Sequence, residues 1–170
     1  MKIGILSDSH HKNEYLKDCI EFLKKEECEY LIHAGDICSK DGLDILKNSN
    51  LKYIAVFGNN DRDLFQFVQD YNIKKEPYYF KIKDKSFKLM HLPFHLHPDT
   101  DIIIFGHTHK FDCEYKNKKL FINPGEVCAR EKPIISCAKL EINTNEYIIT
   151  HYFKNTNENN FMKEEFRYEQ

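Results

Sequence analysis

Five short polar clusters in the sequence combine carboxylate, imidazole and amide side chains. They are Asp8-Ser9-His10, Gly35-Asp36, Gly58-Asn59-Asn60-Asp61, the single His91, and Gly106-His107-Thr108-His109. Hard oxygen donors mixed with borderline nitrogen donors suit Mn²⁺, Fe²⁺, Zn²⁺ or Co²⁺ and are poor for Ca²⁺. The two carboxylates, one amide and four imidazoles make seven candidate ligands, which are too many for one catalytic ion but fit two ions that share a bridging carboxylate. Two ions roughly 3.5–4 Å apart can hold a hydroxide and stabilise in-line displacement at phosphorus.

Each cluster directly follows a short apolar run, which predicts that it lies where a buried strand ends. In open α/β sheets, ligands bind outside the carboxyl ends of the strands, so polar residues that are far apart in the sequence converge there. Gly35, Gly58 and Gly106 allow sharp exits from these strands and a close approach of backbone to ligand.

The apolar pattern predicts an α/β fold in two parts. The first 70 residues alternate between strands and helices, with strands at 2–7, 30–33 and 52–57 and helices near 13–25, 42–47 and 64–68. Later strands follow at 78–83, 87–90, 102–105, 113–115, 120–122, 134–140 and 147–153, most of them paired as hairpins. The predicted class is two mixed β-sheets packed as a sandwich and flanked by helices. Residues 1–153 are expected to form a single domain. Residues 154–170 are expected to form a polar C-terminal tail with a short helix at 161–168.

Composition excludes several classes of function. Lys plus Arg is 25 and Asp plus Glu is 27, so a net charge of −2 leaves no basic excess for dedicated nucleic-acid binding. No apolar run approaches the roughly 20 residues that span a bilayer, and the first residues do not resemble a secretory signal. The six cysteines include no C-x-x-C pair and are interpreted as reduced thiols. We therefore expect a cytoplasmic protein with no membrane partner.

Each cluster alone is weak evidence, because a Gly-Asp pair is usually a turn and Asp-x-His occurs by chance. In this order, however, the five clusters resemble the pattern of the calcineurin-like metallophosphoesterase superfamily. The short chain and the segment Ile122-Asn123-Pro124-Gly125 are similar to its small YfcE-like phosphodiesterase branch. The resemblance extends to about residue 150 and implies a four-layer α/β sandwich.

The resemblance also implies a role for each residue. Asp8, His10 and His109 would hold one metal ion, Asn59, His91 and His107 would hold a second, and Asp36 would bridge them. A hydroxide bridging the two ions would attack phosphorus. Asp61 would orient a ligand or a proton donor, so Asp36, Asn59 and Asp61 form the predicted catalytic set. Arg130 could pair with a phosphate, although an ordinary surface arginine is an equal alternative.

Three departures from the family pattern bear on substrate and ligands. Asn60, a predicted substrate-binding residue, stands where many members have a histidine that protonates the leaving group, and an amide cannot do so near neutral pH. His95 and His97 lie close to His91 in a proline-containing segment that is too short for a full helix, and either could replace His91 as ligand. Glu126 adds a negative charge near a site for anions, which could disfavour phosphomonoesters.

The sequence therefore predicts a dinuclear metal-dependent phosphodiesterase acting on a small phosphoester. Two divalent transition metal ions are expected, with manganese favoured over iron, zinc, nickel or cobalt. The alternatives are a phosphomonoesterase or dinucleotide-polyphosphate hydrolase, and a non-catalytic interaction scaffold on the same fold. A homodimer is possible by analogy with small members of the family.

Overall fold

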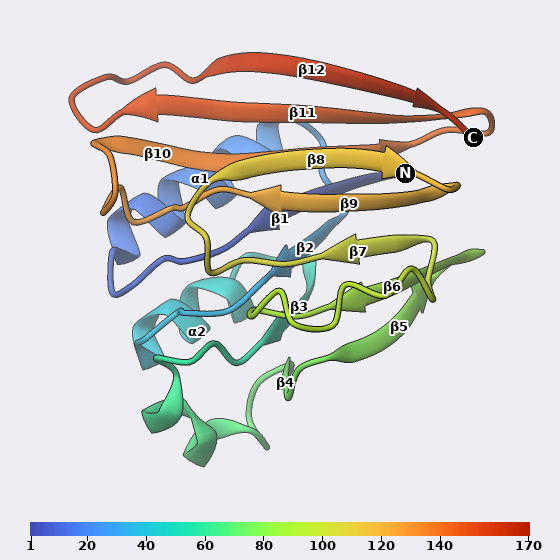
Figure 1. Cartoon of the computed structure of the whole chain (residues 1–170). Coiled ribbons are helices and arrows are strands. Elements are labelled where there is room, and N and C mark those ends of the chain that lie inside the picture. Colours follow the sequence, from blue (N-terminus) through green and yellow to red (C-terminus); the bar gives the residue numbers. More distant parts are fainter.

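A computed structural model describes residues 1–170 and contains two mixed β-sheets packed face to face (Figure 1). The seven-stranded sheet has the order β12-β11-β10-β1-β2-β3-β4 and the five-stranded sheet the order β5-β6-β7-β9-β8. The strands of the first are β1 (Lys2–Leu6), β2 (Tyr30–His33), β3 (Lys52–Val56), β4 (Ile73–Lys74), β10 (Ile134–Ile142), β11 (Glu146–Asn155) and β12 (Met162–Glu169). Those of the second are β5 (Tyr78–Ile82), β6 (Lys85–Leu89), β7 (Ile102–Ile104), β8 (Phe111–Lys116) and β9 (Lys119–Pro124). The predicted pair of mixed sheets is confirmed.

The helices form where their apolar residues share one face. Helix α1 (Asn13–Lys25) buries Leu16, Cys19, Ile20 and Leu23, which recur at helical spacing. Helix α2 (Lys40–Lys47) begins at Ser39, whose hydroxyl accepts a hydrogen bond from the amide of Gly42 at 3.0 Å. A 3₁₀ helix, η1, covers Arg62–Phe67. Both α-helices pack on the seven-stranded sheet, behind it in Figure 1.

Strand β1 shows why the central strands are apolar throughout. Ile3 and Ile5 face the five-stranded sheet and join the core between the two sheets. Leu6 faces the other way and joins the core beneath the helices. Because successive side chains of a strand point to opposite faces, a strand covered on both sides needs apolar residues at every position.

The outer face of the five-stranded sheet carries a loop in place of a helix. Segment 92–100 contains no helix or strand and crosses this face in front of β6 and β7 (Figure 1). The Nζ of Lys88 on β6, only 1% exposed, donates hydrogen bonds to the carbonyl oxygens of His95 (2.9 Å) and His97 (2.7 Å) and pairs with Asp99. The helices thus flank one sheet only, and the fourth layer implied by the resemblance is this loop.

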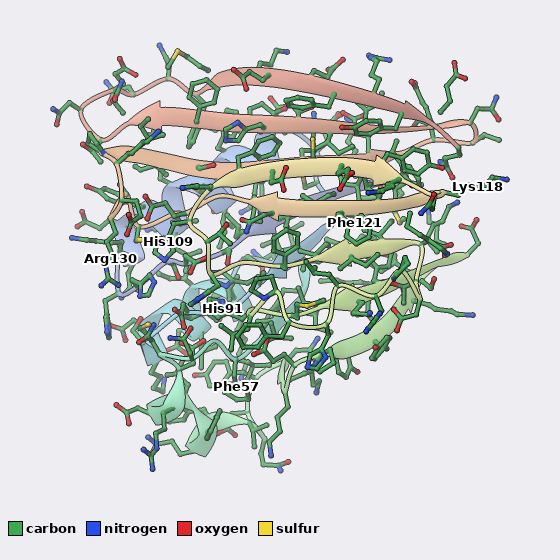
Figure 2. All side chains as sticks on the ribbon, in the orientation of Figure 1. Phe57, His91, His109, Lys118, Phe121 and Arg130 are labelled. Atoms are coloured by element: carbon green, nitrogen blue, oxygen red, sulfur yellow. The ribbon has the colours of Figure 1, made fainter.

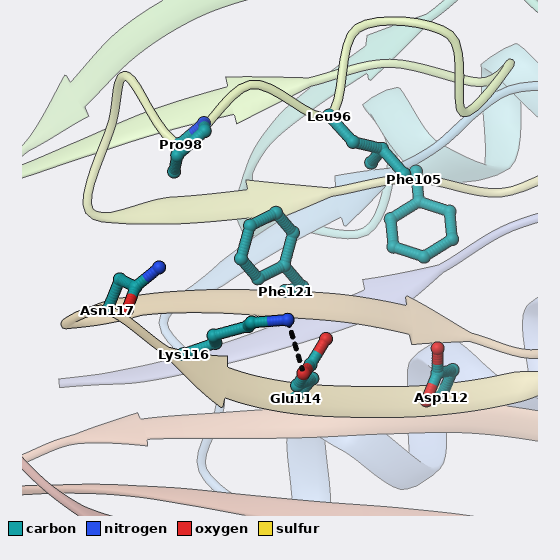
Figure 3. Close-up of a pocket in the computed structure, with 8 residues that line it drawn as sticks. All are labelled: Leu96, Pro98, Phe105, Asp112, Glu114, Lys116, Asn117 and Phe121. Carbon is teal, nitrogen blue, oxygen red and sulfur yellow. Dashed lines mark ion pairs between the residues drawn. The ribbon is translucent and has the colours of Figure 1, made fainter.

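A cavity of about 350 Å³ lies between this loop and the sheet (Figure 3). Leu96, Pro98, Phe105 and Phe121 form its apolar part, and the acidic side chains of β8 lie along one side. None of the seven predicted ligands lines it, so it is separate from the predicted site.

The helix predicted among the C-terminal residues is wrong. Residues 161–168 do not form a helix, because Met162–Glu169 is strand β12, which pairs antiparallel with β11. Phe166 and Tyr168 alternate with charged residues and pack against the core between the sheets. This period of two is the signal that the helix prediction overlooked.

Candidate metal centre

All five polar clusters lie at one edge of the molecule. Asp8, Asp36 and Asn59 follow the carboxyl ends of β1, β2 and β3, and His91 and His107 follow β6 and β7. Figure 2 shows His91, His109 and Arg130 toward this edge and Lys118 at the opposite end.

The backbone in these turns is held in unusual conformations. Five of the seven predicted ligands have positive φ angles: Asp8 (54°), His10 (38°), Asp36 (56°), His107 (68°) and His109 (61°). Such residues cost free energy, and they cluster where a site needs side chains at fixed positions. Gly58 is required by close approach, because a Cβ there would lie 2.1 Å from Asp36 Oδ1.

The side chains of Asp8, His10 and His109 form one group of predicted ligands. Asp8 is fully buried, and its Oδ1 lies 3.2 Å from His109 Nε2 and 3.7 Å from His10 Nε2. Its Oδ2 accepts hydrogen bonds from the Ser7 hydroxyl (2.6 Å) and the His107 amide (3.0 Å). One oxygen of Asp8 is therefore fixed by the protein, and the other faces the two imidazoles.

Asp36 lies between this group and a second one. Its Oδ2 is 3.4 Å from His10 Nε2 and 3.3 Å from His91 Nε2. His91 is fully buried, its Nδ1 is 2.8 Å from the carbonyl oxygen of Ala34, and its Nε2 is 2.9 Å from Asn59 Oδ1. The His107 ring stands edge-on to that of His91, with centroids 5.2 Å apart. Asn59 and His107 are exposed, so the site is open on one side.

Asn60 and Asp61 hold the turns in place. Asn60 donates to Asp36 through both its amide (2.8 Å to Oδ1) and its Nδ2 (2.7 Å to Oδ2). Asp61 is buried and accepts hydrogen bonds from the amides of Cys38 (2.7 Å) and Gly58 (2.8 Å). Asp61 thereby ties the turn after β2 to the turn after β3.

The two carboxylates strongly favour positive charge beside them. Burial raises the pKa of Asp8, but the adjacent imidazoles of His10 and His109 outweigh this effect and hold its pKa below the usual range. The pKa of Asp36 is also lowered, because its contacts with His91 outweigh burial. Burial lowers the pKa of His91, but Asp36 raises it above its ordinary value. The carboxylate of Asp8, followed by Cys128 and Glu126, raises the pKa of His109 to about 12.

The residues present fit a divalent metal centre. Asp8 Oδ1 and His10 Nε2 are buried and have no hydrogen-bond partner. No lysine or arginine pairs with Asp8 or Asp36, whose only ion-pair partners are histidines. Buried carboxylates need a compensating charge, and a cation among these oxygen and nitrogen donors would supply it.

The remaining predicted residues lie as follows. His95 and His97 are exposed on segment 92–100, whereas His91 lies beside Asp36, another of the predicted ligands. The Arg130 side chain is exposed and forms no ion pair. His33 is buried, and its Nε2 lies 3.2 Å from the Ser9 hydroxyl.

Sequence reasoning missed the supports supplied by two glutamates. Glu76 accepts hydrogen bonds from the amides of His91 and Leu92 and so fixes the exit from β6. Glu126 is 3% exposed and lies 2.6 Å from His109 Nδ1, so the negative charge predicted near the site is buried and hydrogen-bonded. The only sign of these supports in the sequence is that the residue at position 126 departs from the family pattern. A cavity of about 500 Å³ borders His109 and Glu126 on the side of β10 and β11.

The model of the calcineurin-like phosphoesterase superfamily domain matches residues 1–145, and the chain belongs to this family. It is 31% identical over 160 residues to phosphodiesterase MJ0936 of Methanocaldococcus jannaschii, covering 86% of this chain and 96% of that protein. The phosphoesterase YfcE of E. coli has a similar structure, with a TM-score of 0.68, 21% identity and coverage of 86% and 91%. These relatives support the YfcE-like branch.

The fold is also similar to that of zinc-complexed Vps29 from Entamoeba histolytica. The TM-score is 0.71 at 23% identity, over 98% of this chain and 99% of that chain.

No helix of this protein has the length and apolar character needed to cross a membrane.

Proposed function

We propose that this protein is a metal-dependent phosphodiesterase whose centre holds two divalent ions. The observation that carries the proposal is the position of Asp36 Oδ2, which lies between His10 Nε2 at 3.4 Å and His91 Nε2 at 3.3 Å. A carboxylate placed between two groups of nitrogen and oxygen donors suits a bridging ligand. The similarity to an archaeal phosphodiesterase supports the choice of reaction.

The ligand atoms would divide into two sets around this bridge. Asp8, His10 and His109 would hold one ion, Asn59, His91 and His107 the other, and Asp36 both. When bound, the two metal ions would supply an activated water as nucleophile and neutralise charge on the phosphoryl oxygens. Manganese remains our preferred metal, and the oxygen donors of Asp8, Asp36 and Asn59 are the part of the ligand set that suits it.

The surrounding residues would position these ligands and select the ester. Asn60 orients Asp36 through its two hydrogen bonds, and Asp61 holds the turns that carry Asp36 and Asn59. Because Asn60 cannot donate a proton as a general acid, the site favours leaving groups that depart as anions. The exposed Arg130 would contact the phosphate from the open side.

The test is hydrolysis of bis-p-nitrophenyl phosphate and p-nitrophenyl phosphate by chelator-stripped protein to which Mn²⁺ is returned. We expect metal-dependent cleavage of the diester that exceeds cleavage of the monoester. Asp36→Asn should reduce diester cleavage at least about 100-fold, because the metal clamp is worth several kcal/mol. Metal-independent cleavage, or full activity in Asp36→Asn, would contradict the proposal.

Two alternatives are outcomes of the same assay. Stronger monoester cleavage would favour a phosphomonoesterase or dinucleotide-polyphosphate hydrolase, with a proton donor other than Asn60. The other alternative is a non-catalytic scaffold on the same fold, a fold that this chain shares with Vps29 over 98% of its length. Since that Vps29 structure contains zinc, metal binding alone does not distinguish the scaffold from the enzyme. Bound metal with no cleavage of either ester would support the scaffold.

The cytosol is the proposed location. All six cysteines are free, and four of them are buried. Reduced thiols of this kind are typical of a reducing compartment.

A further inference from the structure

The Glu126 side chain joins a predicted metal ligand to the loop that follows β9. Its Oε2 lies 2.6 Å from His109 Nδ1 and accepts hydrogen bonds from the Arg130 amide (3.0 Å) and the Cys128 thiol (3.1 Å). Its Oε1 accepts from the amides of Glu131 (2.9 Å) and Lys132 (3.3 Å). The carboxylate is buried, and all its hydrogen bonds are to neutral amides, a thiol and one imidazole.

This contact determines which nitrogen of His109 can bind a metal. A carboxylate accepts hydrogen bonds, so His109 Nδ1 must carry a proton and act as the donor. A neutral His109 then presents its lone pair on Nε2, the atom that faces Asp8 Oδ1 at 3.2 Å. The ring is thereby fixed in the orientation that a metal ligand requires.

Of the predicted ligands His10, His91 and His109, only His109 has its Nδ1 beside a carboxylate. His91 Nδ1 meets the neutral carbonyl of Ala34 at 2.8 Å, and His10 Nδ1 meets the Cys38 thiol at 3.6 Å. A carboxylate behind a histidine raises the basicity of the ligand, and such partners commonly change metal affinity 10- to 100-fold.

We propose that Glu126 is a positioning residue for the metal ion held by Asp8, His10 and His109. It holds His109 with Nε2 directed at the ion, and it strengthens binding through its negative charge. The inference rests on the metal centre of the proposed function, but it does not require that the protein hydrolyse any particular ester.

The first test measures metal affinity directly. Calorimetric titration of chelator-stripped protein with Mn²⁺ should show about 10- to 100-fold weaker binding for Glu126→Gln than for the wild type. Glu131→Gln is the matched control, since it removes the same charge from an exposed residue of the same loop. We expect its dissociation constant to remain within twofold of the wild-type value.

Glu126 also accepts three backbone hydrogen bonds, so a purely structural role must be separated from the proposed one. A structural role alone would lower the Tm of metal-free Glu126→Gln while leaving its Mn²⁺ dissociation constant within twofold of wild type. That result would overturn the proposal.

A second measurement needs no variant. In wild-type protein loaded with diamagnetic Zn²⁺ and labelled with ¹⁵N-histidine, NMR should show His109 bound through Nε2 with a slowly exchanging proton on Nδ1. Binding through Nδ1 would overturn the proposal even if Glu126→Gln does not fold. Weakened metal affinity in a protein that hydrolyses neither ester would leave this inference intact and contradict the proposed function. Equal Mn²⁺ affinities of the wild type and Glu126→Gln, in a protein that cleaves the diester, would overturn this inference and support the proposed function.

Discussion

At the scale of single residues, the centre is defined by two buried carboxylates that lack a lysine or arginine partner. Asp8 is fully buried and Asp36 is 2% exposed, and only histidines pair with them. Burying a charge without compensation costs several kcal/mol, so this arrangement is not explained by stability alone. The sequence-based interpretation of these residues as ligands agrees with their convergence, whereas the link from Glu126 to His109 depends on a side-chain contact that no spacing reveals.

His151 provides a residue-scale prediction about stability and pH. Its ring stacks on Phe111 with centroids 3.9 Å apart, and burial lowers its pKa to about 4. Glu164 lies 3.8 Å from Nδ1 but is 60% exposed, so it does not offset burial. Because the folded pKa lies below the unfolded value, the unfolded chain takes up the proton first, and stability falls as the pH decreases from about 6.5 to about 4.

We expect His151 to contribute about 2 kcal/mol to this loss, after allowance for screening by solvent. His151→Phe keeps the stacked ring and removes the titration, so its free energy of unfolding should fall less between pH 7 and pH 4.5. Urea denaturation at both pH values measures the difference. His11→Gln, at an exposed histidine, is the control and should behave like the wild type. An identical pH dependence in His151→Phe and wild type would show that His151 does not titrate in this range.

At the scale of elements, helices and strands are predicted best from the sequence where the period of the apolar residues continues over the whole element. The helix expected over 13–25 is α1, and the strand over 30–33 is β2, because burial on one or both faces gives each a clear pattern. Strand β4 has only two residues, Ile73 and Lys74, and is too short to show any period. Strand β12 was mistaken for a helix because its polar surroundings resemble a tail, although Phe166 and Tyr168 alternate.

The loop over the five-stranded sheet depends on one lysine, which gives a prediction at this scale. Lys88→Met keeps the apolar volume but removes the donor to the carbonyls of His95 and His97. We expect a loss of about 2 kcal/mol in the free energy of unfolding, because two carbonyl acceptors and the Asp99 carboxylate lose their charged partner. Hydrogen exchange at 92–100 should become faster.

The control is Lys81→Met, since Lys81 is an exposed lysine on the neighbouring strand β5. It should change neither the free energy of unfolding nor the exchange of the loop. If Lys88→Met leaves the exchange rates of 92–100 unchanged, then other contacts, such as the hydrogen bond from the Tyr79 hydroxyl to Asp99, hold the loop in place.

At the scale of the whole molecule, the fold brings five strand ends to one edge, where both sheets contribute residues to the same candidate site. Asp8 and Asp36 follow strands of the seven-stranded sheet, and His91 and His109 come from turns of the five-stranded sheet. The sequence predicts this convergence because carboxyl ends of parallel strands share an edge. It does not predict the helix-free outer face, because a loop anchored by a buried lysine has no periodic signature.

A site shared between two sheets should couple metal binding to global stability. Removing the metal leaves Asp8 and Asp36 buried beside each other with only histidines to compensate them, so the chelated protein should unfold more easily. At a free metal concentration 100 times the dissociation constant, linkage stabilises the folded state by about 2.7 kcal/mol, which corresponds to a Tm rise of roughly 5–10 °C for a chain of this size. Differential scanning calorimetry of stripped protein with and without Mn²⁺ measures this shift. Asp8→Asn should show little rise with Mn²⁺ over its own metal-free Tm, which is the reference because the variant also loses the favourable contacts of the carboxylate with His10 and His109. A wild-type Tm that does not respond to Mn²⁺, or a full rise in Asp8→Asn, would mean that these carboxylates do not hold a metal that joins the two sheets.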